Sequence, residues 1–292
     1  MSRAITTRRP RRSAVLALLV LAGLSLVPGA LRAQGRFLLQ LGPRPGDTLH
    51  LEFEQRTELT SAAREGSDAS RTVMGMHVWS RVIAETRQPA RISVIAATDS
   101  AMAVTSDGSD GTPGVPRRAM VVGQMTRFHL APDGTVRVPD DGTADARELA
   151  QSMSLVPATL PAGPVRIGQR WSREMPVAMG GPGEPGKVQA TFQLDSVGRQ
   201  GELAYLSMRG QLVRDSVPAG PPRGTFMKVA GTMTGFLVLD RKRGWFTRSQ
   251  FLMVLNSILT PPAGSGAAPL RFVTRVSQVM WVTDGARGAR AR

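Results

Sequence analysis

The chain has 292 residues, a formal net charge of +15 and no cysteine. The missing cysteines exclude a disulfide framework, a thiolate zinc site and a cysteine nucleophile, and the length suits one large domain or two smaller ones. Six of the 37 basic residues lie within residues 1–33, and the others are scattered without stacking aromatic residues, so we expect no nucleic-acid partner.

Residues 1–33 have the pattern of a secretory signal peptide. Five arginines precede an uncharged apolar stretch over residues 14–27, and cleavage is expected near Ala33. That stretch is too short to span a bilayer comfortably, and no later segment reaches 18 consecutive apolar residues. The sequence therefore predicts a periplasmic or extracellular protein that does not span the membrane.

The N-terminal half, residues 34–160, shows alternation of apolar and polar residues, which is typical of strands. Such segments occupy residues 49–54, 74–79, 92–96 and 126–138, the last with a turn at 132–134. One helix is predicted over residues 144–156, where apolar residues at helical spacing form a single stripe and Pro157 ends it. We place the boundary between the halves near residue 160.

The C-terminal half, residues 161–284, continues the alternation near 188–194, 204–208, 225–239, 251–255 and 272–282. A turn at 198–201 and a charged tip at 240–244 connect neighbouring strands, and residues 285–292 form a basic tail predicted to be disordered. The whole pattern predicts an all-β fold with one helix, in which nine to eleven strands form a strongly curved antiparallel meander sheet, an incomplete barrel. Short matches between the halves fit a duplicated five-strand unit and chance resemblance equally well.

No catalytic or metal-binding motif stands out in the sequence. The three histidines lie on predicted strands without a second histidine or cysteine at ligand spacing. The nucleophile motif of serine hydrolases is missing. A carboxylate pair for glycoside hydrolysis is defined by the distance between the two groups in the folded protein, so the sequence does not reveal whether one is present. We therefore predict no enzyme activity, no metal and no cofactor, and we rank a hydrolase on a β scaffold last.

Methionine is the most informative residue type, because the chain has fourteen methionines but only one tyrosine. Methionine is flexible and polarizable, so it suits a surface that adapts to varied apolar ligands, although it also fills gaps in ordinary cores. We predict a concave ligand-binding face formed by nine apolar residues. They are Met74, Met76, Val78, Phe128, Met208, Met227, Met233, Met253 and Met280.

The long alternating strands, the hairpins at 128–134 and 236–244 and the lone helix resemble the lipoprotein-carrier (LolA/LppX-like) fold. Residues 165–171 also resemble a V-x-I-G-x-x-W element of bacterial envelope proteins without an assigned function. The resemblance implies a curved sheet with an apolar concave side. Our first hypothesis is binding of a hydrophobic or lipid-like ligand there, and the alternative is a structural protein that contacts another envelope protein.

Overall fold

The structure is a computed structural model that describes residues 35–62, 70–88, 91–107, 117–118, 123, 125–137, 159–177, 186–218 and 224–283. Residues 36–292 form one compact unit and residues 1–35 another. The predicted signal peptide at 1–33, the predicted helix at 144–156 and the predicted tail at 285–292 lie outside the described residues. Within the described residues, the single helical element is the 3-10 turn η1, Arg199–Gly201.

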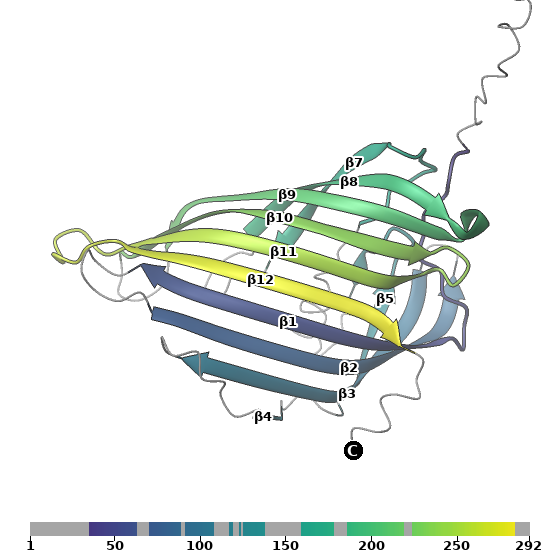
Figure 1. Ribbon diagram of the computed structural model, residues 1–292, viewed down its shortest axis with the longest axis horizontal. Coiled ribbons are helices and arrows are strands. Elements are labelled where there is room, and N and C mark those ends of the chain that lie inside the picture. Colours follow the sequence, from purple (N-terminus) through teal and green to yellow (C-terminus); the bar gives the residue numbers. More distant parts are fainter. Residues whose placement is uncertain are drawn as a thin grey trace, which may run out of the picture. The chain divides into compact units, whose positions relative to one another are not determined.

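Twelve strands form one sheet, in the order β6-β5-β3-β2-β1-β12-β11-β10-β9-β8-β7, with β4 paired to β3 (Figure 1). Their bounds are β1 Thr48–Ala62, β2 Ser70–Gln88, β3 Arg91–Asp107, β4 Arg117–Arg118, β5 Met125–Leu130, β6 Val136–Arg137, β7 Arg170–Val177, β8 Gly186–Gly198, β9 Leu203–Pro218, β10 Phe226–Asp240, β11 Trp245–Thr260 and β12 Leu270–Thr283.

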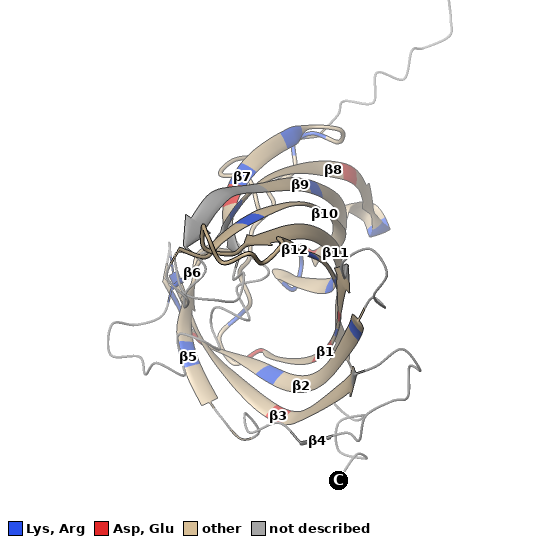
Figure 2. Cartoon of the chain, turned by 90° about the vertical axis from the view of Figure 1, so that its left-hand side faces the viewer, with Lys and Arg blue, Asp and Glu red and all other residues tan. Residues whose placement is uncertain are grey.

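Every strand pair is antiparallel, and the pairing of β1 with β12 joins the two halves of the chain within the same sheet. The sheet curls strongly, so that β1–β3 face β8–β12 (Figure 2). Its outermost strands are β6 and β7, and among the described residues these two strands are not paired with each other. The prediction of a curved antiparallel meander that stays open is therefore confirmed.

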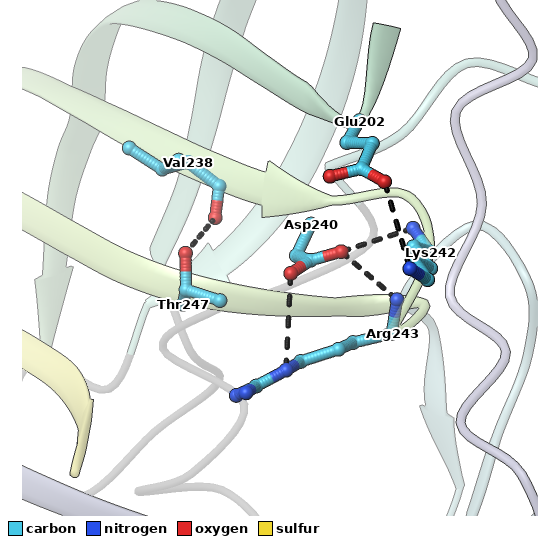
Figure 3. Close-up of polar contacts among 6 residues, drawn as sticks. All are labelled: Glu202, Val238, Asp240, Lys242, Arg243 and Thr247. Carbon is cyan, nitrogen blue, oxygen red and sulfur yellow. Dashed lines mark hydrogen bonds and ion pairs between the residues drawn. The ribbon is translucent and has the colours of Figure 1, made fainter. Parts of the chain in front are cut away.

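The charged tip between β10 and β11 is a tight turn ordered by one aspartate (Figure 3). Oδ1 of Asp240 accepts hydrogen bonds from the backbone N–H groups of Lys242 (3.0 Å) and Arg243 (2.9 Å). Gly244 follows with φ +64° and lies so close to Gly42 that a Cβ atom would stand 2.6 Å from its carbonyl carbon. Glycine is thus required at position 244 by both its conformation and its neighbour.

A segment that we name the clasp, residues 37–46, crosses the end of the sheet where β1 begins and β10 ends. Its backbone bonds to Val165 ahead of β7, to Pro132 after β5 and to Gly244 in the tip, with donor–acceptor distances of 2.7–3.0 Å. Leu39 in the clasp is 1% exposed and packs into the main core. The clasp therefore links the two outer edges of the sheet, which do not pair with each other.

The core lies on one face of the sheet, which we name the inner face. In antiparallel pairs, directly opposite residues share a face, and the buried apolar residues of β1, β2 and β8–β12 are opposite one another in this way. Gly231 and Gly235 of β10 lie under Leu255 and Phe251 of β11, where added Cβ atoms would stand 2.6 Å and 2.5 Å from those side chains. Glycines here let bulky neighbours lie flat against the backbone.

Candidate ligand-binding face

All nine residues predicted to form the ligand-binding face lie on the inner face by strand register. Their surroundings differ, however. Phe128, Met208, Met233 and Met280 are buried in the core. Met74 is 44% exposed. The other four, Met76, Val78, Met227 and Met253, are half-buried. The structure thus places the nine residues on one surface, and it divides them between a dry core and a more accessible region.

On β1 and β2, burial on the inner face falls with distance from the clasp, whereas on β8–β10 it does not: Val188, Leu212 and Val229 lie far from the clasp and are 0%, 2% and 1% exposed. In β1, Leu49 and Leu51 are 7% and 6% exposed, whereas Leu59 is only half-buried. In β2, Val82 is 1% exposed and Met74 is 44% exposed. The residues far from the clasp on β1, β2, β11 and β12 form a half-exposed apolar surface that we name the inner patch. Its members are Leu59, Met74, Met76, Met253, Phe272 and Val276.

Two glutamines mark the border between the core and the inner patch. Gln55 of β1 and Gln278 of β12 are directly opposite each other on the inner face. Gln278 is only 6% exposed, and Gln55 donates to Thr57 Oγ1 over 3.4 Å. Primary amides in an apolar setting need hydrogen-bond partners. These two amides therefore place polar groups between the core and the inner patch.

A polar cluster that sequence reasoning missed lies on the opposite, outer face. Glu52 of β1 accepts hydrogen bonds from Trp281 Nε1 (3.1 Å) and pairs with His77 Nε2 (2.8 Å). The His77 ring stacks on Trp79 with its centroid 3.8 Å away. The alternation of β1 and β2 already places these residues on polar faces, but only the register brings three strands together. Among the described residues, no three His, Cys, Asp or Glu side chains are arranged to hold a metal ion.

The outer face also carries two open hollows. One of about 800 Å³ spans β7–β10 and is lined largely by hydroxyl and amide side chains such as Thr191, Gln193 and Ser207. The other, of about 420 Å³, lies over Gly75, between Met102 and Val279. An added Cβ atom at Gly75 would meet nothing within 4 Å. This glycine therefore leaves a gap in an otherwise side-chain-covered surface.

Arginines on the outer face favour the charged form of the Glu58 carboxylate. A hydrogen bond from Arg56, opposed by partial desolvation and aided by Arg71, lowers the pKa of Glu58 below its ordinary value. A lowered folded-state pKa stabilises the fold above the unfolded pKa, and this contribution is lost as pH falls through the folded pKa. The stabilisation is small, because the pair is largely exposed to solvent.

We expect Glu58→Gln to lower the free energy of unfolding at pH 7 by less than about 1 kcal/mol. Because glutamine does not titrate, the variant should also lose less stability than the wild type between pH 7 and pH 3. Urea unfolding at the two pH values measures both effects. Glu202→Gln, which removes a carboxylate 3.7 Å from Lys242, is the control and should stay within about 0.5 kcal/mol of the wild type at pH 7. Equal acid sensitivity of E58Q and wild type would contradict the assignment.

No helix among the described residues is long and apolar enough to cross a membrane.

Comparisons with known proteins identify a similar fold but no established function. Residues 143–246 match the model of a family of unknown function (DUF6263). No curated protein matches the sequence. A structure of lipovitellin, described in terms of its lipid–protein interactions, is similar over 83% of this chain with a TM-score of 0.53 and 9% sequence identity. This chain spans only 26% of that lipovitellin chain.

The translocator domain of the autotransporter NalP from Neisseria meningitidis aligns with 91% of this chain and 96% of its own length, at 10% identity and a TM-score of 0.21. That score is too low to support an argument. The likeness to lipovitellin concerns the fold alone, because one fold supports many functions.

Proposed function

We propose that this protein is an exported binding protein that holds a hydrophobic or lipid-like ligand against the inner patch. The observation that carries the proposal is the fall in burial along the inner face of β1 and β2, from a dry core beside the clasp to half-exposed apolar side chains far from it. A fully packed scaffold would keep both ends of these strands buried. An acyl chain laid on the inner patch would remove its apolar surface from water, at about 0.8 kcal/mol per buried CH₂ group.

The composition of the inner patch supports a ligand of variable shape. Met74, Met76 and Met253 supply unbranched side chains that adapt to irregular apolar partners. The similarity in fold to lipovitellin, which is described by its interactions with lipid, supports the same class of ligand. The resemblance of the sequence pattern to lipoprotein carriers supports it as well.

Export belongs to the same proposal and rests on residues 1–33. The mature protein would begin at Gln34, three residues before the clasp. Expression in a Gram-negative bacterium, followed by the intact mass of the protein in the periplasm and the medium, tests this part. A chain that retains Met1 and stays with the cytoplasmic fraction would contradict it.

The methionines at positions 74 and 102 provide a matched pair for testing the ligand site. Met74 is 44% exposed on the inner face of β2, and Met102 is 42% exposed on the outer face of the neighbouring strand β3. We expect Met74→Glu to weaken binding of a neutral fluorescent acyl ester at least tenfold, because a carboxylate against an acyl chain loses its hydration. Met102→Glu should change the affinity by less than twofold. Fluorescence titration of the folded proteins measures both.

Equal affinities of both variants and the wild type would show that the probe binds elsewhere. Native mass spectrometry of gently purified protein gives an independent measurement. A mass equal to that of the bare chain, together with no uptake of the acyl ester by the wild type, would end the proposal.

A further inference from the structure

Arg173 is a charged residue on the inner face, where the register also places Arg87 of β2, which is exposed and donates to the carbonyl oxygen of Gly42 in the clasp over 3.3 Å. Arg173 lies on β7 opposite Ala190 of β8, which is a fully buried inner-face residue. Within β1, β8, β10, β11 and β12, no inner-face side chain that the structure describes is charged. The guanidinium of Arg173 therefore points toward the same side of the sheet as the core and the inner patch.

The hydrogen bonds of Arg173 are incomplete. One Nη atom donates to the carbonyl oxygen of Leu160 over 2.7 Å, next to a bond from Trp171 Nε1 to the carbonyl oxygen of Thr159, also of 2.7 Å. These bonds fasten residues 159–160 to β7. The Nε atom of Arg173 is buried and has no hydrogen-bond partner among the described residues.

Carboxylates of the described strands are engaged elsewhere. In the ion pairs of the described residues, an arginine, lysine or histidine side chain pairs with an aspartate or glutamate on the outer face or at a strand end. None of these pairs includes Arg173. A buried donor of a charged group without a partner is costly. A planar guanidinium is best satisfied by an anion that accepts two parallel hydrogen bonds, such as a carboxylate or a phosphate.

We propose that the ligand of the inner face is an amphiphile with an anionic head, and that the head pairs with Arg173 while the acyl chain lies on the inner patch. This inference rests on the proposed function, and it adds the charge of the ligand and the residue that recognises it. A carboxylate and a phosphate share the chemistry that Arg173 would select. A neutral ester or alcohol of the same chain length lacks it.

The test compares ligands that differ only in the head group, on the full mature chain. Hexadecanoic acid, hexadecyl phosphate and methyl hexadecanoate are titrated by competition against the neutral fluorescent ester. We expect the wild type to bind at least one of the two anions tenfold or more tightly than the methyl ester, and the stronger anion identifies the head group.

Two arginines on opposite faces of β7 give the matched variants. Arg173→Gln should bring the ratio of anion to ester affinity close to one while ester binding is retained. Arg170→Gln should keep the wild-type ratio, because Arg170 lies on the outer face and donates to Gln193 over 2.7 Å. If Arg173→Gln does not fold, Arg173→Lys is tested in its place. Lysine cannot donate two parallel hydrogen bonds to one anion, so this variant should lower the ratio of anion to ester affinity.

The outcomes separate the two proposals. A wild type that binds the ester and both anions equally well overturns the role of Arg173 and leaves the proposed function standing. An unchanged ratio of anion to ester affinity in a folded Arg173→Gln variant also overturns the role of Arg173 in head-group recognition. The arginine then serves only to fasten residues 159–160 to β7. A wild type that binds none of the three ligands overturns the proposed function itself.

Discussion

Replacing Leu39 with alanine is expected to lower the free energy of unfolding by about 2–5 kcal/mol. Leu39 is 1% exposed and is the clasp residue that packs most deeply into the core. Its removal leaves a cavity at the point where the clasp holds together strands far apart in the sheet. Because β6 and β7 are not paired with each other, the lost packing cannot be offset by strand hydrogen bonds there. Urea unfolding followed by tryptophan fluorescence measures the change.

The neighbouring leucine gives the control for this experiment. Leu38 is 44% exposed. Its backbone carbonyl oxygen accepts a hydrogen bond from Arg241 Nε over 3.4 Å. Leu38→Ala keeps this carbonyl and should cost less than about 0.5 kcal/mol. If L39A and L38A destabilise the protein equally, the clasp does not anchor the core as the structure indicates.

The second large effect is expected at Gly231, where alanine should destabilise the protein by about 2–3 kcal/mol. An added Cβ atom would stand 2.4 Å from the carbonyl oxygen of Val254 and 2.6 Å from a methyl group of Leu255. The carbonyl oxygen belongs to the paired strand β11, so relief requires the two backbones to move apart and not a simple side-chain rotation. Chemical unfolding, together with amide exchange of the β10–β11 pair, measures the cost and its location.

Gly75 of β2 is the matched control, since it is also a glycine within a long strand. An added Cβ atom there meets nothing within 4 Å. Gly75→Ala should therefore leave stability unchanged or raise it by up to about 1 kcal/mol, because alanine restricts the unfolded chain. A destabilisation of G75A as large as that of G231A would show that the loss of glycine itself, and not the close approach of β11, sets the cost.

Much of the fold follows from local patterns in the sequence. Alternation with a period of two depends only on neighbouring residues, so it locates strands such as Phe226–Asp240 within a residue or two of the predicted range 225–239. The same alternation assigns each side chain to a face, and all nine residues of the predicted ligand-binding face indeed share one face. Turn residues are equally local: Asp133 accepts from the backbone N–H of Thr135 over 3.0 Å, as expected for the predicted turn.

The accessible part of that face could not be predicted from the pattern. Met233 and Met74 look alike in sequence, since both lie in alternating strands, but Met233 is 6% and Met74 is 44% exposed. Met233 belongs to the core cluster and Met74 does not, and membership of the core depends on what the rest of the fold packs against each side chain. Such contacts join residues far apart in the chain, and composition does not reveal them.

Local sequence patterns predict most of the long strands, the face of each side chain and several turns, because each depends on residues within a few positions of one another; they do not predict β7. Three other features emerge only from tertiary contacts: the role of residues 37–46 as a clasp, the pairing of Glu52 with Trp281 across 229 positions, and the place of Arg173 on the inner face. These depend on strand register and on the curl of the sheet, which bring distant residues together. The physical reason is that local sterics set the conformation of each strand, whereas burial of the whole inner face sets the arrangement of the strands.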